Sequence, residues 1–452
     1  MDLKDAQEKT TVLQSKLYQA AKEIPTRRFH QLYDKLFRED VLWSAYGQVK
    51  RNGGAPGIDG VRITDIEASG TSEYLVTLGA KLREQTYRPQ ALRRVEIPKA
   101  NGKMRCLGIP TVEDRIVQAA MKLVLEPIFE ADFVSVSFGF RPGIGQADAL
   151  DAISQNARKG FRHVVDADIE GFFDNVDHEQ VMEALRRRIS DGAILRLIYR
   201  WLKAGVMIGF QYEDTDQGTP QGGVISPLLG NVYLHALDVA FSDKHKGFFG
   251  HLVRYADDLL IQCGRREDAE QALIWLEHFL ARMGLRLSRE KTRIVEDNVE
   301  GFDFLGFHHR RGTSTFGRSK GQTYLTRWPS TKSRQRFRDR IKELLVRTGY
   351  IHDAAEWREV RNELNRYIRG WGQYFRKGQR GRVLAKLDGY VNERVARYLA
   401  RSQPKGKKRR RRHWPHFGRW LRERRSMLLL SSTRNWMPNP YRGQANIRWK
   451  AV

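Results

Sequence analysis

The sequence predicts an α+β protein followed by a basic helical part. Short apolar strands that carry or adjoin carboxylates alternate with amphipathic helices up to about residue 325. Beyond about residue 330 the apolar spacing becomes wholly helical and basic residues dominate the polar positions. A chain of 452 residues allows roughly three structural modules, each able to bury its own core.

Helices are expected first, because Leu13, Leu17, Leu32 and Leu36 recur at helical spacing within residues 1 to about 50. The glycine-rich run at 52–60 contains a proline and must turn, either as a plain connection or as a functional loop. Two strands, at 91–97 and 104–109, are expected to form a hairpin through Asn101-Gly102.

A helix at 112–129 should follow this hairpin and end at Pro127. Carboxylates then flank two predicted strand segments, at 163–170 and at 251–263, and the second segment is expected to be strand, tight turn, strand. The other expected elements are helices at 148–157, from about 177, at 194–205, at 224–241 and at 269–285 with a C-terminal cap at Gly284, a turn at 217–223, and an aromatic strand at 302–307.

The charge balance favours nucleic acid as the partner. Lys and Arg number 80 against 53 Asp and Glu, a formal net charge of +27, and a folded polycation needs a polyanionic partner. Residues 401–452 hold 16 basic residues and one acid, Glu423. Such a run is often only a solvated tail, but here aromatic residues interleave with the charge, which favours phosphate pairing combined with base stacking.

Cysteine content and hydropathy exclude other classes of protein. The chain has two cysteines, Cys106 and Cys263, too few for a disulfide framework or a zinc module of the CxxC type. No apolar stretch approaches the roughly 18 residues that a membrane span requires. A reducing, cytoplasmic compartment and no membrane partner are therefore expected.

Three aspartates indicate phosphoryl-transfer chemistry. Asp168 and the pair Asp257-Asp258 lie at or next to strand ends among apolar residues, where an unpaired carboxylate is costly. Two Mg²⁺ ions bound to such oxygens can activate an attacking hydroxyl and stabilise the leaving oxygen. Each aspartate taken alone is equally explained as a cap or a hairpin tip, so the prediction of a metal site depends on their combination.

The phrases around these aspartates resemble known motifs. Tyr255-Ala-Asp-Asp258 resembles the YxDD motif of reverse transcriptases, and the segment 166–176 resembles the motif with their first metal-binding aspartate. The segment 217–235 resembles the nucleotide-site motif of the same family. Further matches, in the right order, are NGGAPGIDG, IPKANGKMRCLGIPTVEDRIVQ, SFGFRPG, GLRLSREKTRI, FDFLGF and LNRYIRGWGQYFRKG. The set is similar to group II intron reverse transcriptase/maturases over nearly the whole chain.

This resemblance implies a right-hand polymerase, with fingers and a palm that holds an antiparallel sheet, followed by an α-helical thumb and a basic C-terminal region. The implied parts are an N-terminal helical extension at 1–50, reverse transcriptase fingers and palm at 51–325, a maturase or thumb domain at 326–400 and a basic nucleic-acid-binding region at 401–452. No cluster of Cys and His follows residue 420, so the endonuclease module of many relatives is not expected.

Residue roles follow from the same resemblance. Asp168 and Asp257 would ligate both Mg²⁺ ions, for which Mn²⁺ is a possible substitute, with Asp258 as third carboxylate and Ile169 offering its backbone carbonyl. Phe173 matches the aromatic steric gate that excludes a ribose 2′-hydroxyl. The residues implied in nucleotide binding are Lys99, Arg105, Gln221, Gly222 and Lys291, the last being nearly as consistent with an ordinary surface lysine.

Nucleic-acid contacts are implied for the helical part and the tail. Arg366, Arg369 and Arg376 belong to the maturase-type motif, where the aromatic Trp371 and Phe375 would mainly pack and the arginines would face RNA. The tail residues implied in binding are Lys405, Lys407, Lys408, Arg409, Arg410, Arg411 and Arg412.

The implied function is an RNA-directed DNA polymerase that assists splicing of its intron RNA and copies it into cDNA during retromobility. Its partners would be the intron RNA, a DNA target and primer, and deoxynucleoside triphosphates, in a bacterial cytoplasm. Two alternatives remain open: an RNA-binding splicing factor without polymerase activity, and a reverse transcriptase recruited by a host for defence, CRISPR spacer acquisition or repair.

Overall fold

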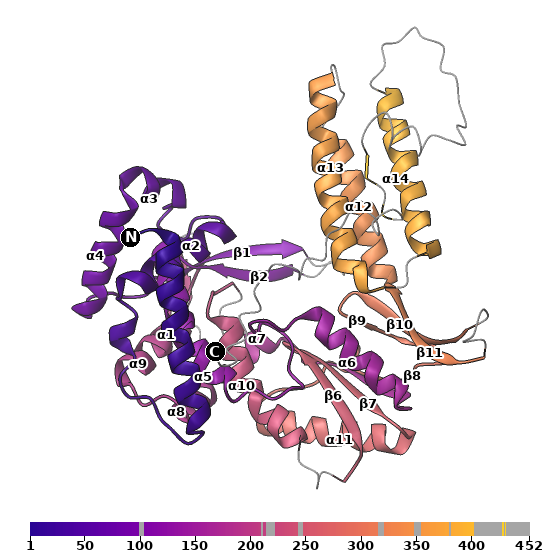
Figure 1. Cartoon of the computed structure of the whole chain (residues 1–452), viewed down its shortest axis with the longest axis horizontal. Helices are drawn as coiled ribbons and strands as arrows, with labels where there is room; N and C mark the ends of the chain where they lie inside the picture. The colour runs from indigo at the N-terminus through magenta and orange to yellow at the C-terminus, as the bar shows by residue number, and fades with distance from the viewer. Residues whose placement is uncertain are drawn as a thin grey trace. The chain divides into compact units, whose positions relative to one another are not determined.

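The chain folds into two compact units. A computed structural model describes residues 1–98, 104–208, 211–213, 222–242, 247–314, 321–347, 354–378, 381–401, 427–428 and 430. Within these residues the first unit comprises Met1–Ile153 and Val165–Ile294, and the second comprises Ser154–Val164 and the chain from Val295 onwards. Figure 1 labels the helices and strands of both units.

Helices form the amino-terminal part of the first unit, as predicted. They are α1 (Leu3–Glu23), the short 3₁₀ helix η1 (Tyr33–Lys35), α2 (Glu39–Asn52), α3 (Ile63–Ser69), α4 (Thr71–Arg83) and α5 (Val112–Glu130). The long helices α1, α2 and α5 pack against one another and bury residues such as Leu13, Leu17 and Val117. This three-helix core explains why the apolar spacing of residues 1–50 is so regular.

Pro127 does not end α5, contrary to the sequence prediction, because it lies inside the last turn of the helix. A proline has no N–H, so the carbonyl four residues earlier, that of Leu123, loses its helical donor. The side-chain amide of Gln14 in α1 donates to this carbonyl at 2.9 Å. A tertiary hydrogen bond therefore replaces the helical one, and the helix continues.

The first unit also contains a four-stranded sheet in the order β2-β1-β4-β5. The predicted hairpin is confirmed by the antiparallel pair β1 (Leu92–Pro98) and β2 (Met104–Ile109), while Asn101-Gly102 lies outside the described residues. The sequence did not predict β4 (Val206–Ile208), which runs parallel to β1, or β5 (Gln211–Glu213). Strands of three residues are too short to show an alternating pattern.

A second four-stranded sheet, most of whose residues belong to the first unit, has the order β6-β7-β3-β8. Its strands are β3 (His163–Asp168), the antiparallel pair β6 (Gly250–Tyr255) and β7 (Asp258–Cys263), and β8 (Arg293–Glu296). Helix α11 (Arg266–Arg282) packs on β6 and β7, as Figure 1 shows. The remaining helices are α6 (Gln146–Arg158), α7 (Phe172–Asn175), α8 (His178–Arg186), α9 (Gly192–Leu202) and α10 (Ser226–Phe241).

Helix termini agree with the predictions to within a few residues. The Asp177 side chain accepts a hydrogen bond from Gln180 N at 2.8 Å and caps α8. Helix α9 ends at Leu202, three residues before the predicted Gly205. Gly284, predicted to cap α11, follows the cap residue Met283 with a φ of +70°.

The second unit combines a small sheet with three long helices. The sheet has the order β11-β10-β9, formed by β9 (Phe302–Phe304), β10 (Phe307–Thr313) and β11 (Thr323–Pro329). Helices α12 (Thr331–Arg347), α13 (Ala354–Tyr374) and α14 (Gly381–Arg401) follow, with the 3₁₀ helix η3 (Phe375–Lys377) between the last two. They enclose a second core that includes Phe337, Leu364 and Val391.

The predicted helical character beyond residue 330 is therefore confirmed, as is the mixed α+β class with antiparallel strand pairs. The strands β10 and β11 were not predicted, since His, Arg and Gly dilute the apolar alternation in His308–Thr313. Among the described helices, none combines the length and the apolar character that crossing a membrane would require.

Candidate active site

The hairpin of β6 and β7 presents two of the three predicted aspartates. Tyr255 pairs with Asp258 at the end of the ladder, which leaves Ala256 and Asp257 as the two residues of the turn. Ala256 adopts a φ of +57°, a conformation that turns of this kind require and that a residue with a Cβ atom disfavours. The predicted strand, tight turn, strand is confirmed, and its tip carries adjacent carboxylates.

Asp168 ends the neighbouring strand β3 and is held from two sides. Its carbonyl accepts a hydrogen bond from Ser288 N at 2.8 Å, and its carboxylate accepts one from Lys291 Nζ at 2.7 Å. Asp166 lies two positions earlier, and hence on the same face of the strand, where Arg293 Nε is 3.4 Å from its carboxylate. The sheet thus brings Asp168 and Lys291, which are far apart in the sequence, into direct contact.

The carboxylates interact electrostatically. The pKa of Asp258 is raised to about 7, first because burial disfavours its ionised form and then because Asp257, Asp168 and Asp166 place negative charge nearby, while Lys291 opposes this rise. Burial here concerns the surroundings of the carboxyl group, whereas Asp258 as a whole residue is exposed to solvent. Water and salt therefore screen part of the repulsion. The three predicted carboxylates therefore share one region of the first unit.

The chemistry of these side chains suits a hard divalent cation. Carboxylate oxygens are the preferred ligands of Mg²⁺, and a nearby cation favours ionisation of a carboxylate that its neighbours disfavour. Within the described ranges, no group of three or more His, Cys, Asp or Glu side chains is already arranged to hold a metal ion. The cation that contacts Asp168 here is the Lys291 ammonium group. Ile169, the proposed source of a carbonyl ligand, is buried and forms an isolated bridge with Leu287.

Phe173 lies in the short helix α7, directly after β3. The left-handed Gly171, with a φ of +53°, turns the chain from the strand into this helix. Phe172 is buried, whereas Phe173 is partly exposed, and the two ring centroids lie 5.0 Å apart. A Cβ atom on Gly230 of α10 would crowd Phe172 at 3.1 Å, whereas its 3.5 Å from Phe173 would be an ordinary contact, so this glycine leaves room for the Phe172 ring. Phe173 is therefore a partly exposed aromatic residue shortly after the strand that ends at Asp168.

Two predicted nucleotide-binding residues lie outside the described part of the chain, and a third is described only in part. The two are Lys99 and Gln221, and Arg105 is placed by its backbone alone, opposite Ile97 in the β1–β2 ladder. Gly222 is described and has a φ of +122°. A Cβ atom there would lie 2.6 Å from the carbonyl oxygen of Gly108 in β2, so only glycine fits.

The maturase-type motif divides into a packing side and a solvent side. Trp371 lies 4.8 Å from Phe337 and 4.3 Å from Phe375 between ring centroids, and Phe375 is buried. Arg366 and Arg369 are exposed on α13, and Arg376 in η3 is partly exposed. The basic tail residues from Lys405 to Arg412 lie outside the described residues.

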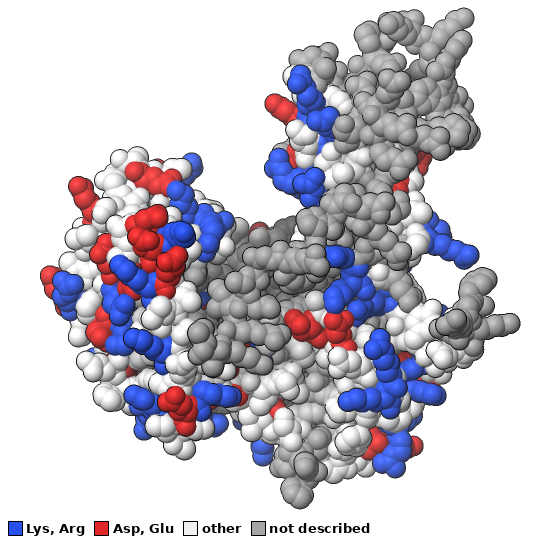
Figure 2. Space-filling view, in the orientation of Figure 1, with Lys and Arg blue, Asp and Glu red and all other residues white. Residues whose placement is uncertain are grey.

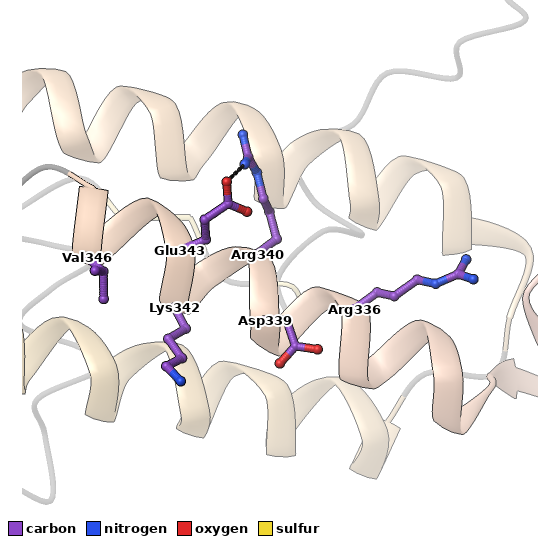
Figure 3. A pocket seen from close by; sticks show the side chains of 6 residues that line it. All are labelled: Arg336, Asp339, Arg340, Lys342, Glu343 and Val346. Atoms are coloured by element: carbon purple, nitrogen blue, oxygen red, sulfur yellow. Dashed lines mark hydrogen bonds and ion pairs between the residues drawn. The ribbon is translucent and has the colours of Figure 1, made fainter. Parts of the chain in front are cut away.

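Helix α12 carries a cavity of about 530 Å³ on its surface. Figure 3 shows Arg340 and Glu343 turned toward each other, with 2.6 Å between Arg340 Nη1 and Glu343 Oε1, while the side chains of Lys342 and Asp339 point away from this pair. The lining residues are Arg336, Asp339, Arg340, Lys342, Glu343 and Val346. Because charges of both signs line it, this cavity does not favour a small anionic ligand.

The helices at the start of the first unit also carry charges of both signs. Figure 2 shows basic and acidic side chains interspersed over α1 to α4 on the face in view. In contrast, residues 331–400 hold 18 Lys and Arg against 8 Asp and Glu. The excess positive charge is therefore concentrated in the helical part and in the tail that follows it.

Comparison with known proteins agrees with these features. Residues 97–309, which include the carboxylate strands, match the family model described as reverse transcriptase (RNA-dependent DNA polymerase). Residues 334–417 match the model of the group II intron maturase-specific domain. The chain belongs to the family of group II intron-encoded reverse transcriptase/maturases.

Curated relatives cover different parts of the chain. The group II intron-encoded protein LtrA of Lactococcus lactis is 43% identical over 212 residues, 46% of this chain and 35% of LtrA, so the match spans about a third of that relative's length. Protein YkfC of Escherichia coli is 33% identical over 342 residues, 68% of this chain and 89% of YkfC. A protein encoded in the cob intron of Schizosaccharomyces pombe is 27% identical, with 81% of this chain and 53% of its own length covered.

Sequence reasoning missed Asp166 as a charged neighbour of the site, together with its partner Arg293. It also missed Arg254, the residue before the YADD motif, which is fully buried. A signal was present, since Arg254 follows Leu252 and Val253 in an apolar strand, where a charge requires a buried partner.

Proposed function

We propose that this protein is an RNA-directed DNA polymerase encoded by a group II intron, which assists splicing of that intron and copies it into cDNA during retromobility in a bacterial cytoplasm. One observation carries the proposal: Asp258 at the start of β7 lies within electrostatic reach of Asp257 in the adjoining turn and of Asp168 at the end of β3, and Lys291 pairs with Asp168. A group of carboxylates gathered in this way is what metal-assisted phosphoryl transfer requires.

Asp168, Asp257 and Asp258, with the carbonyl of Ile169, would hold two Mg²⁺ ions or Mn²⁺ in their place. When bound, these ions supply charge neutralisation and activation of the primer hydroxyl. Lys291, already 2.7 Å from Asp168, reduces the repulsion among the carboxylates.

The remaining residues of the proposed site act on the nucleotide. Lys99, Arg105 and Gln221 would bind the deoxynucleoside triphosphate, and charge-assisted contacts from the two cations would oppose its negative charge. Gly222, which has no side chain to obstruct it, lets the backbone approach the nucleotide. The partly exposed ring of Phe173 would occupy the position of a ribose 2′-hydroxyl and so select deoxynucleotides.

The arrangement we propose is a right hand. Residues 51–325 would form the fingers and palm, with β6, β7, β3 and β8 as the palm sheet. Residues 326–400 would form the thumb from α12, α13 and α14, after the N-terminal extension at 1–50. The separate hydrophobic cores of the two units support a modular arrangement of this kind.

Intron RNA would bind the basic helical part, and the DNA target and primer would bind the tail at 401–452. Exposure of Arg366 and Arg369 on α13 supports this, because their aromatic neighbours Trp371 and Phe375 pack inward and leave the arginines facing solvent. Pairing of these cations with phosphates would release counterions and make binding dependent on salt.

Extension of a DNA primer on an RNA template with deoxynucleotides and Mg²⁺ tests the polymerase. The full chain is compared with Asp257→Asn, which removes a charge at the turn, and with Asp5→Asn, which removes the charge of an exposed aspartate on α1. Extension by the wild type and by Asp5→Asn, with at least a 100-fold loss in Asp257→Asn, is expected. Equal extension by all three proteins, or none by the wild type, contradicts the proposal.

The maturase role has its own assay. Splicing of a structured group II intron RNA is followed with and without the protein, using the wild type and a variant in which Arg366 and Arg369 are both replaced by Ala. Because both side chains are exposed, the variant should fold normally and bind the RNA less tightly. Unchanged RNA affinity and unchanged splicing would remove these arginines from the proposed interface.

A further inference from the structure

A fully buried ion pair lies directly behind the turn that carries Asp257. Arg254, in β6, and Asp238, in α10, are both 0% exposed. Arg254 Nε donates to one carboxylate oxygen of Asp238 at 2.7 Å, and Nη2 donates to the other. The guanidinium group is thus paired in the two-pronged geometry that fixes its orientation.

The remaining nitrogen of Arg254 reaches the turn itself. Nη1 donates to the carbonyl of Ala256 at 3.0 Å and to Asn231 Oδ1 at 2.9 Å. Ala256 is the residue with a φ of +57°, a conformation that persists only where the surroundings impose it. Arg254 therefore fixes the carbonyl of the strained residue that immediately precedes Asp257.

The same network holds a second segment against the turn. Asn231 Nδ2 donates to the carbonyl of Gly139 at 2.8 Å. Gly139 packs so closely on the turn that a Cβ atom there would collide with the backbone of Ala256 and lie 3.0 Å from the carbonyl carbon of Tyr255. Phe138 N donates to the carbonyl of Arg254 at 2.9 Å. The turn is consequently fixed by hydrogen bonds on one side and by backbone contact on the other.

Stability alone does not explain this arrangement. A buried ion pair gives little net stability compared with apolar residues of the same size, because removing both charges from water is costly. Its hydrogen bonds do specify one geometry, and here they end on the carbonyl of Ala256. A displacement of a reacting group by about 1 Å can reduce a rate about 100-fold.

We propose that Arg254, Asp238 and Asn231 are positioning residues, which hold the Ala256–Asp257 turn in place and so set the rate of nucleotide transfer without contributing to substrate affinity. This inference rests on the proposed polymerase function. These three buried side chains would act on catalysis only through the turn, without touching the substrate.

Gly139→Ala tests the proposal without removing any buried polar group. The added methyl group should displace the turn, lowering kcat for primer extension at least tenfold while KM for the nucleotide and Kd for primer–template stay within about twofold. Gly145→Ala is the matched control, since a Cβ atom at this nearby glycine meets nothing within 4 Å. Equal kcat in the two variants, or a loss confined to KM, overturns the proposal.

Asn231→Ala is the second variant, in case Gly139→Ala does not fold. It breaks the bonds to Arg254 and Gly139, and the same tenfold loss of kcat at unchanged KM is expected. Combined with Gly139→Ala it should cost less than the product of the two single losses, because both act on one turn. Independent, fully multiplicative losses overturn a shared role.

Amide hydrogen exchange of the peptide that spans residues 254–260 separates this inference from the proposed function. Exchange there should be at least tenfold faster in Gly139→Ala and Asn231→Ala than in the wild type and Gly145→Ala. A wild type that does not extend primers overturns the polymerase and the rate-setting role together, and the exchange rates still decide whether the network holds the turn. Unchanged exchange in both variants overturns the positioning role even if extension is lost.

Discussion

His309 makes the second unit sensitive to acid. The side chain lies in β10, is 0% exposed and stacks on Phe302 of β9 with 4.8 Å between ring centroids and 2° between ring planes. Burial, assisted by the positive charges of Arg327 and His308, lowers the pKa of His309 to about 3. An imidazole in this position stays neutral throughout the ordinary pH range.

The consequence for stability follows from proton linkage. The unfolded chain binds a proton at His309 with a pKa of about 6.5 and the folded chain does so only near 3, so the unfolded state holds more protons between these values. The folded state therefore has its full stability with respect to His309 above about pH 6.5, and it loses stability as the pH falls from about 6.5 towards 3. At pH 5 the loss is about 2 kcal/mol, from roughly 1.5 pH units at about 1.4 kcal/mol each.

His309→Phe and His309→Leu remove the titrating group and differ in packing. Urea unfolding of the full chain at pH 8 and pH 5, followed by pulsed hydrogen exchange of the peptide covering residues 302–313, measures the stability of this sheet. In the wild type the free energy of unfolding should be lower at pH 5 than at pH 8, and in both variants this difference should be smaller by about 2 kcal/mol. If the wild type and both variants show the same pH dependence, His309 does not titrate as argued.

Three other predictions concern the proposed site and the tail. Lys291→Ala should change stability by less than about 1 kcal/mol, since its pair with Asp168 is partly exposed, but it should lower primer extension at least tenfold. Lys291→Arg keeps the charge and should retain more activity, so an equal loss in both variants contradicts the charge argument. Gly222→Ala, which brings a Cβ atom to 2.6 Å from the carbonyl oxygen of Gly108, should raise KM for the nucleotide several-fold in single-turnover kinetics. Deletion of 401–452 should flatten the salt dependence of RNA binding, which for roughly six to ten phosphate contacts spans about three to five decades, while short primer extension persists; a loss of extension on a simple primer and template would refute the modular interpretation.

Local sequence patterns were sufficient for the hairpins and most helices. The apolar residues on either side of Asp257-Asp258 predicted the β6–β7 hairpin, because strand alternation and turn formation depend on neighbours along the chain. The same reasoning was wrong at Pro127, where the side chain of Gln14 compensates for the missing helical hydrogen bond. No pattern confined to residues 112–130 could have revealed a donor from another helix.

The sequence by itself suggested most members of the proposed site, namely Asp168, Asp257, Asp258, Lys291 and Gly222, because these residues occur in motifs that follow one another in order along the chain. Only the tertiary structure decided their relations: that Lys291 pairs with Asp168, that Asp258 lies among the charges that raise its pKa, and that Arg254 supports the turn from the interior. The physical reason is that hydrogen bonds and Coulomb interactions act over a few ångströms in space, whereas motifs record neighbours along the chain.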